Sequence, residues 1–264
     1  MRNPIRNTDL NRLVRVLDGY TAGHFTLPGA VVRAETALRN LQAVEVNIPD
    51  ADAAFFEVVD ATLAAAADGK RLPPVTSLLK TRAAAAEATA HRDVLIRCLT
   101  SAEDQLVQSI RSNADAIITK HLAPVIAEIM AEAAEAARNA EGDGDRVTLL
   151  HGSQANVAAW RTLEVLAERY RAVREVRRVL ATGVKHDDPA LFTELRAGLR
   201  AVWPRAGTAT AGPAPWPDAP SARLRWLATC GHEVWLPTEA QRDQAWLAAY
   251  GDDAQQAQAK RLVG

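Results

Sequence analysis

The chain has 264 residues, which is long enough for a substantial hydrophobic core in one or two domains. Alanine accounts for 53 of them and aromatic residues for only 5%, a composition that favours helices over a β-sandwich or barrel. With a formal net charge of −1, the chain as a whole has no positive charge that would attract it to nucleic acid or to anionic lipid. The only two cysteines, Cys98 and Cys230, exclude a disulfide framework and a four-cysteine metal site.

The first 70 residues predict three helices. Apolar residues recur at helical spacing from Thr8 to about Leu17, and a second helix fits residues 30–44. Residues 44–48 alternate apolar and polar side chains, but no partner strand is evident, so we expect an extended connector. Asp50 is a suitable N-cap for a third helix that ends near Ala67.

The middle of the chain predicts a long antiparallel helical hairpin. Residues 76–140 read as one helix, which Pro124 should kink because its ring clashes with the carbonyl four residues earlier. After a turn-rich break, residues 153–181 form a strongly amphipathic second helix. Neither helix can bury its apolar stripe alone, so we expect the two to pack against each other.

The C-terminal third predicts a tethered module. Asp188 and Pro189 suit the start of a helix that runs to about Val202, which closes a helical body over residues 1–202. Residues 203–220 are rich in Pro, Gly and Ala and read as a linker. Residues 221–264 then form a small module with helices at about 221–229 and 239–250, the second preceded by a capping box at residues 238–241. The predicted fold class is therefore all-α.

Tryptophans are concentrated in this module and its linker. Tryptophan is common at interface hot spots, so a docking arm that inserts aromatic side chains into a partner is one interpretation. The alternative is that these side chains form the module's own core or pack back on the long helices. The candidate partner-binding residues are Trp216, Trp226, Trp235 and Trp246.

Arginines crowd one stretch of the second hairpin helix. They could bind nucleic acid through phosphate contacts. They could instead be compensated within the molecule, because residues 128–145 are strongly acidic and Glu175 can pair with Arg171 and Arg178 on its own helix. The arginines concerned are Arg169, Arg171, Arg174, Arg177 and Arg178.

No motif predicts catalysis, a cofactor or a metal. Cys230, His232 and Glu233 are neighbours, but they are too few for a zinc site and lack the third group that would orient a Cys–His pair. A glycine C-cap at Gly231 explains this segment better. Phosphate-binding, dinucleotide-binding, zincin and nucleophile-elbow motifs are all missing from the sequence.

Residues 76–181 resemble helical proteins of unassigned role in actinobacterial phage and prophage structural gene clusters. The resemblance rests on residues 114–124, ADAIITKHLAP, and residues 163–174, LEVLAERYRAVR. It implies a helical component of head or tail morphogenesis, with capsid, portal or tail proteins as partners, and it carries over no catalytic residue.

The sequence therefore predicts a non-catalytic structural or assembly protein that acts through protein contacts and could form a homo-oligomer. The alternative is a nucleic-acid-binding protein that uses the Arg169–Arg178 face. No apolar run is long enough to span a bilayer, so we expect no membrane contact and a cytoplasmic or virion-associated chain.

Overall fold

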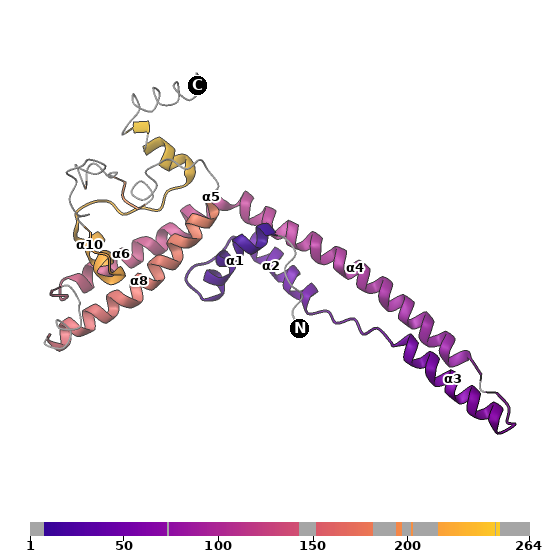
Figure 1. Ribbon diagram of the computed structural model, residues 1–264. Helices are drawn as coiled ribbons and strands as arrows, with labels where there is room; N and C mark the ends of the chain where they lie inside the picture. Colours follow the sequence, from indigo (N-terminus) through magenta and orange to yellow (C-terminus); the bar gives the residue numbers. More distant parts are fainter. Residues whose placement is uncertain are drawn as a thin grey trace, which may run out of the picture. The chain divides into compact units, whose positions relative to one another are not determined.

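The computed structural model describes residues 8–72, 74–142, 152–181, 194–196, 202, 216–245 and 247–248 (Figure 1). These residues are helical apart from short connectors and one isolated β-bridge, which confirms the all-α class. The helices are α1 (Thr8–Thr21), α2 (Gly29–Gln42), α3 (Ala51–Ala67), α4 (Thr76–Ser112), α5 (Ala114–Ala116), η1 (Ile117–Leu122), α6 (Ala123–Ala137), α8 (Gln154–Leu180) and α10 (Pro220–Thr229).

The chain divides into two compact units. Unit 1 comprises Met1–Asn11 and Val32–Ser109, and unit 2 comprises Arg12–Val31 and Ile110–Gly264. The first part of the long middle segment groups with α3 and most of α2, so residues of the predicted body over 1–202 belong to both units. Most of the predicted linker, residues 203–215, lies outside the described residues, so its boundaries stay a prediction.

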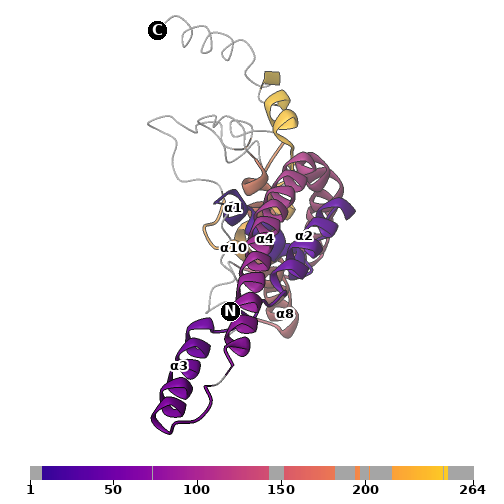
Figure 2. The same ribbon diagram turned by 90° about the vertical axis from the view of Figure 1, so that its right-hand side faces the viewer.

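In unit 1, α3 lies beside the first half of α4 (Figures 1 and 2). The α3 helix begins where the sequence predicts, because the Asp50 carboxylate accepts hydrogen bonds from the amides of Asp52 and Ala53 at 3.0 and 2.8 Å. The Arg82 guanidinium of α4 lies 5.7 Å from the centre of the Phe55 ring of α3. No residue of α3 is buried.

The predicted single helix over residues 76–140 is interrupted twice, and this part of the prediction is wrong. The α4 helix ends at a turn at Asn113, a residue whose side chain competes for backbone hydrogen bonds. The π-helical turn η1 then precedes Pro124, and the Ala123 amide bonds back five residues to the Ile118 carbonyl. Pro124 sits in the first turn of α6, where no amide hydrogen is needed, so the widened turn accommodates the proline.

In unit 2, α6 and α8 pack side by side and α10 packs on both (Figure 1). The α8 helix starts after Ser153, whose hydroxyl accepts a hydrogen bond from the Asn156 amide at 3.2 Å. The predicted hairpin is thus confirmed for α6 and α8. The sequence left open whether the C-terminal module packs on the long helices, and α10 does pack on them. The core side chains include Ile126, Ile129, Leu163, Leu166, Val173, Leu224 and Leu227.

Residues 194–196 contradict the helix predicted after Pro189. Leu195 forms an antiparallel bridge with Val234 instead. The Arg196 amide donates to the Glu233 carbonyl, and the Trp235 amide donates to the Glu194 carbonyl, each at 3.1 Å. Leu195 is fully buried, so burial of this one side chain together with two backbone hydrogen bonds overrides the helical tendency of the segment. The rest of that predicted helix, except residue 202, lies outside the described residues.

A close approach at Gly19 of α1 gives a first prediction. A methyl group there would lie 2.6 Å from Cε1 of the buried Phe25 ring and 3.6 Å from Cγ2 of Val176 in α8. We expect Gly19→Ala to lower the free energy of unfolding by about 1–3 kcal/mol, because the ring must move within a packed site. Urea denaturation measures the change.

Phe25→Leu supplies the control for this prediction. The Phe25→Leu chain lacks the ring edge. In that chain, Gly19→Ala should lower the free energy of unfolding by less than it does in the unmodified chain. An equal cost in both backgrounds would show that the contact with the ring is not the cause.

Candidate functional site

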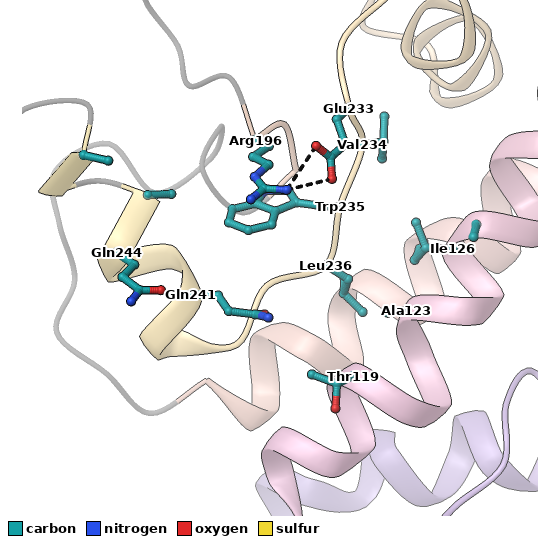
Figure 3. A pocket seen from close by; sticks show the side chains of 13 residues that line it. Thr119, Ala123, Ile126, Arg196, Glu233, Val234, Trp235, Leu236, Gln241 and Gln244 are labelled. Atoms are coloured by element: carbon teal, nitrogen blue, oxygen red, sulfur yellow. Dashed lines mark hydrogen bonds and ion pairs between the residues drawn. The ribbon is translucent and has the colours of Figure 1, made fainter.

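A groove of about 950 Å³ lies in unit 2 (Figure 3). One wall comes from η1 and α6, and the other from residues 233–236 and the helical residues that follow Thr238. That helical turn carries the predicted capping box, because the Gln241 side chain accepts from the Thr238 amide at 3.0 Å and the Thr238 hydroxyl accepts from the Gln241 amide at 3.2 Å. The lining residues that Figure 3 labels include Thr119, Ala123, Ile126, Arg196, Trp235 and Gln244.

The charged edge of the groove is formed by Arg196 and Glu233. Arg196 Nη1 lies 3.3 Å from each carboxylate oxygen of Glu233, and its guanidinium lies 5.4 Å from the centre of the Trp235 ring (Figure 3). Both charged side chains are about 60% exposed, so water screens the pair and it adds little stability.

The groove carries no catalytic constellation among the described residues. Among the lining residues that the structure describes, the ionisable groups are Arg196 and Glu233, which bind each other, and none is a serine, cysteine or histidine. Nor do the described residues contain a cluster of three His, Cys, Asp or Glu side chains that could hold a metal ion.

The segment around Cys230 has a structural role in the described chain. Cys230 is the C-cap of α10, and Gly231 adopts a φ of 73°, as the sequence predicts for a glycine that ends a helix. The Cys230 thiol lies 3.4 Å from the Leu227 carbonyl. Cys98 and Cys230 are both free thiols.

Four of the five clustered arginines contact other groups of unit 2. Arg169 pairs with Glu128 of α6 at 2.9 Å, so part of the basic stretch does face the acidic helix. Arg178 binds both carboxylate oxygens of Glu175 at 2.6 and 2.7 Å, as predicted, whereas Glu175 also binds Arg15 and not the predicted Arg171. Arg171 itself is exposed.

Arg177 is the most deeply placed arginine of the cluster, at 5% exposure. Its Nε donates to the Pro237 carbonyl at 3.0 Å, and its Nη2 lies 3.1 Å from the Glu239 carboxylate. Burial lowers the pKa of the Arg177 guanidinium, because the charged form loses hydration, and the negative charge of Glu239 opposes this shift. Arg242 Nη2 approaches the other Glu239 oxygen at 2.6 Å, out of line for a hydrogen bond.

Glu175 gives a pH-dependent prediction. Hydrogen bonds from Arg178, and then the charges of Arg178 and Arg15, lower the pKa of its carboxyl, so the ion pairs stabilise the fold above the ordinary glutamate pKa and are lost as the pH falls. Glu175→Gln should cost about 0.5–1 kcal/mol at neutral pH. The difference should vanish as the pH falls below about 4. Unfolding measured from pH 7 to pH 3 checks this.

The control for Glu175→Gln is Glu164→Gln. Glu164 is exposed on the same helix and forms no ion pair among the described residues. A cost for Glu175→Gln that stays constant at every pH would contradict the ion-pair explanation.

A polar network around Glu194 was not predicted from the sequence. The Tyr170 hydroxyl donates to the Glu194 carboxylate at 2.8 Å, and Arg223 of α10 pairs with the same carboxylate. Arg174 donates to the Tyr170 oxygen at 2.8 and 3.0 Å and to the Glu194 carbonyl at 3.2 Å. Burial, and the neighbouring Glu194, raise the pKa of Tyr170. No sequence signal marked Glu194, because it lay inside the predicted helix.

The described tryptophans of the predicted docking set contact their own unit. Trp216 and Trp226 lie 5.8 Å apart between ring centres, with the Arg223 guanidinium 5.6 Å from the Trp216 ring. Trp235 lies beneath Arg196 (Figure 3), and all three indoles are half-buried. These contacts join the indoles to Arg196 and to one another within the C-terminal segment, so they favour the interpretation that the tryptophans help to form the module's own core. The side chain of Trp246 lies outside the described residues.

A different surface, in unit 1, exposes large apolar side chains. Phe56 and Leu63 of α3 are 62% and 64% exposed, and Leu79 of α4 is 60% exposed. Phe55 lies against Arg82, which is three residues beyond Leu79 on α4. We call Phe55, Phe56, Leu63 and Leu79 the α3–α4 apolar face. Val44, Leu72, Val75 and Val94 of the same unit are also exposed, whereas unit 2 exposes Val165 and Leu247 among its described residues.

In the described part of the chain, no helix combines the length and the apolar character needed to cross a membrane. Comparison of the chain with family models, with curated proteins and with solved structures finds no match.

Proposed function

We propose that this chain is a non-catalytic assembly protein that binds another protein through the α3–α4 apolar face. One observation carries the proposal: α3 is a 17-residue helix in which no residue is buried, although it is rich in alanine and carries two phenylalanines. Several large apolar side chains exposed on one helix and its neighbour are the kind of surface that marks an interaction site.

A protein partner suits the face better than a lipid surface does. The charged residues of α3 are Asp52, Glu57 and Asp60, all of them acidic. Anionic lipid headgroups would repel α3, whereas a protein can present basic groups to α3 and acidic groups to the basic start of α4. The contacts of the arginine cluster in unit 2 likewise favour protein binding over the nucleic-acid alternative, because four of its five guanidinium groups already contact groups of the same unit.

The resemblance to phage and prophage proteins suggests that the larger assembly is a phage head or tail, in which capsid, portal or tail proteins are the other components. This part of the proposal rests on the resemblance alone. Mass spectrometry of purified virions from the source strain tests it: recovery of this chain with the structural proteins supports a role in morphogenesis, and its absence from virions and from assembly intermediates contradicts it.

The experiment for the docking surface is photo-crosslinking in the cell that naturally makes the chain. A benzophenone amino acid replaces Phe56 in one variant and Val165 in the other. Val165 is the matched control because it is an exposed apolar residue of unit 2, at 68% exposure. We expect a protein adduct from position 56 and little from position 165. No protein adduct from position 56, or an adduct with nucleic acid, would contradict the proposal.

Adding charge to the face should weaken this contact. Phe56→Glu with Leu63→Glu should reduce the adduct formed by a crosslinker at position 79 at least about tenfold, because the interface would have to bury two carboxylates. The fold should survive, since both side chains are exposed. Val165→Glu is the control, and an unchanged yield in the double variant would contradict the assignment.

A further inference from the structure

The α3–α4 hairpin separates its charges by sign along the chain. Residues 43–69, which contain α3, hold six acidic residues and no basic one. Residues 70–86, which contain the start of α4, hold four basic residues and no acidic one. The apolar face is therefore bordered by acid on one helix and by base on the other.

These opposite charges remain largely unpaired within the described part of the chain. Asp68 binds Lys70 at 2.8 Å, and Asp50 caps its own helix. Among the described residues, Asp52, Glu57 and Asp60 form no ion pair, although α4 lies beside their helix. Lys80 forms none either, and the described contact of Arg82 is with the Phe55 ring.

We propose that the occupant of the α3–α4 apolar face is a second copy of this chain, with α3 of each copy on the first half of α4 of the other. A two-fold axis brings the same surface of both copies together, so the contact between an acidic and a basic helix occurs twice in one interface. The same contact covers the exposed apolar side chains of both copies. This inference rests on the proposed function and names its partner.

The first test is the mass of the full chain in solution. Sedimentation velocity should show a monomer converting to a dimer as the concentration rises from about 1 to 100 μM, the range of a modest interface. The dimer should weaken as salt is raised, because exposed charges contribute to it. A chain that stays monomeric throughout this range overturns the inference.

The second test uses two charge-reversed full-length chains. One carries Asp52→Lys and Asp60→Lys, so that both of its helices are basic. The other carries Lys80→Glu and Arg82→Glu, so that both are acidic. Each alone should dimerise at least about tenfold more weakly than the unmodified chain, because like charges meet across the axis. An equimolar mixture should restore a one-to-one dimer.

Restoration on mixing distinguishes loss of the contact between two copies from damage to the hairpin itself. Damage to a hairpin within one chain is not repaired by a different chain, and circular dichroism of each variant monitors helix content directly. A folded mixture that remains monomeric overturns the inference. A position-56 adduct with a different polypeptide, from a chain that is itself monomeric, overturns the second-copy inference and keeps the proposed function. The absence of any protein adduct removes the proposed function itself.

Discussion

Arg177→Ala should lower the free energy of unfolding by roughly 3 kcal/mol, because it removes one partner of a buried ion pair and a hydrogen bond to a buried carbonyl. The guanidinium connects α8 to Pro237 and Glu239, so its loss leaves Arg242 as the one basic partner of the Glu239 carboxylate among the described residues. Denaturant unfolding of the full chain gives the cost. A change below about 1 kcal/mol, the size expected for an exposed pair, would show that this arginine is solvated.

A double replacement separates the effect of the lost charge of Arg177 from the effect of its lost packing volume. Replacing both partners, as in Arg177→Met with Glu239→Gln, should recover part of the loss, since no unpaired charge remains buried. Arg171→Ala supplies the surface control, because Arg171 is an exposed arginine of the same helix. We expect it to change stability by less than about 0.5 kcal/mol.

Trp160→Ala should cost about 3–5 kcal/mol, the range for truncating a large buried aromatic side chain. Trp160 is 2% exposed, its Nε1 donates to the Glu141 carbonyl at 3.0 Å, and the Arg225 guanidinium of α10 lies 5.5 Å from its ring. Near the connection between α6 and α8, the side chain thus links both helices of the hairpin to α10. Thermal unfolding monitored by circular dichroism measures the loss.

Trp160→Phe is the control for the hydrogen bond. It keeps most of the buried ring and removes the donor to Glu141, so it should cost about 1–2 kcal/mol. Equal costs for Ala and Phe would assign the effect to the hydrogen bond and contradict a role in packing.

Local signals in the sequence predicted most helix boundaries. The cap at Asp50, the capping box at Thr238 and the glycine at position 231 were identified correctly, because each depends on neighbouring residues alone. The apolar periodicity of residues 153–181 likewise predicted the face that α8 buries against α6.

Long-range contacts explain what the sequence did not predict. The bridge between Leu195 and Val234 joins residues about forty positions apart, and the residues next to Leu195 do not predict it. The interruption at Asn113 was missed because the apolar pattern continues across it. The packing of α10 on the hairpin was left open, since tryptophans suit a core and an interface equally.

The candidate site was harder to predict than the fold for a related reason. The pattern of apolar residues in α3 is typical of a helix that packs against its own chain. The same pattern occurs in a helix that stays exposed and binds another protein, so the sequence alone does not distinguish the two. Only the exposed fractions of Phe56, Leu63 and Leu79 in the structure make the difference.

Hydrogen exchange in α3 tests the central claim most directly. A helix with no buried residue should exchange its amides readily in the monomer and slowly once another protein covers it. Measured on the full chain at low and high concentration, exchange in α3 and in the first half of α4 should slow together, while α8 stays unchanged. Equal exchange of α3 at every concentration, and in complexes isolated from the cell, would contradict the claim that this face is where the chain binds protein.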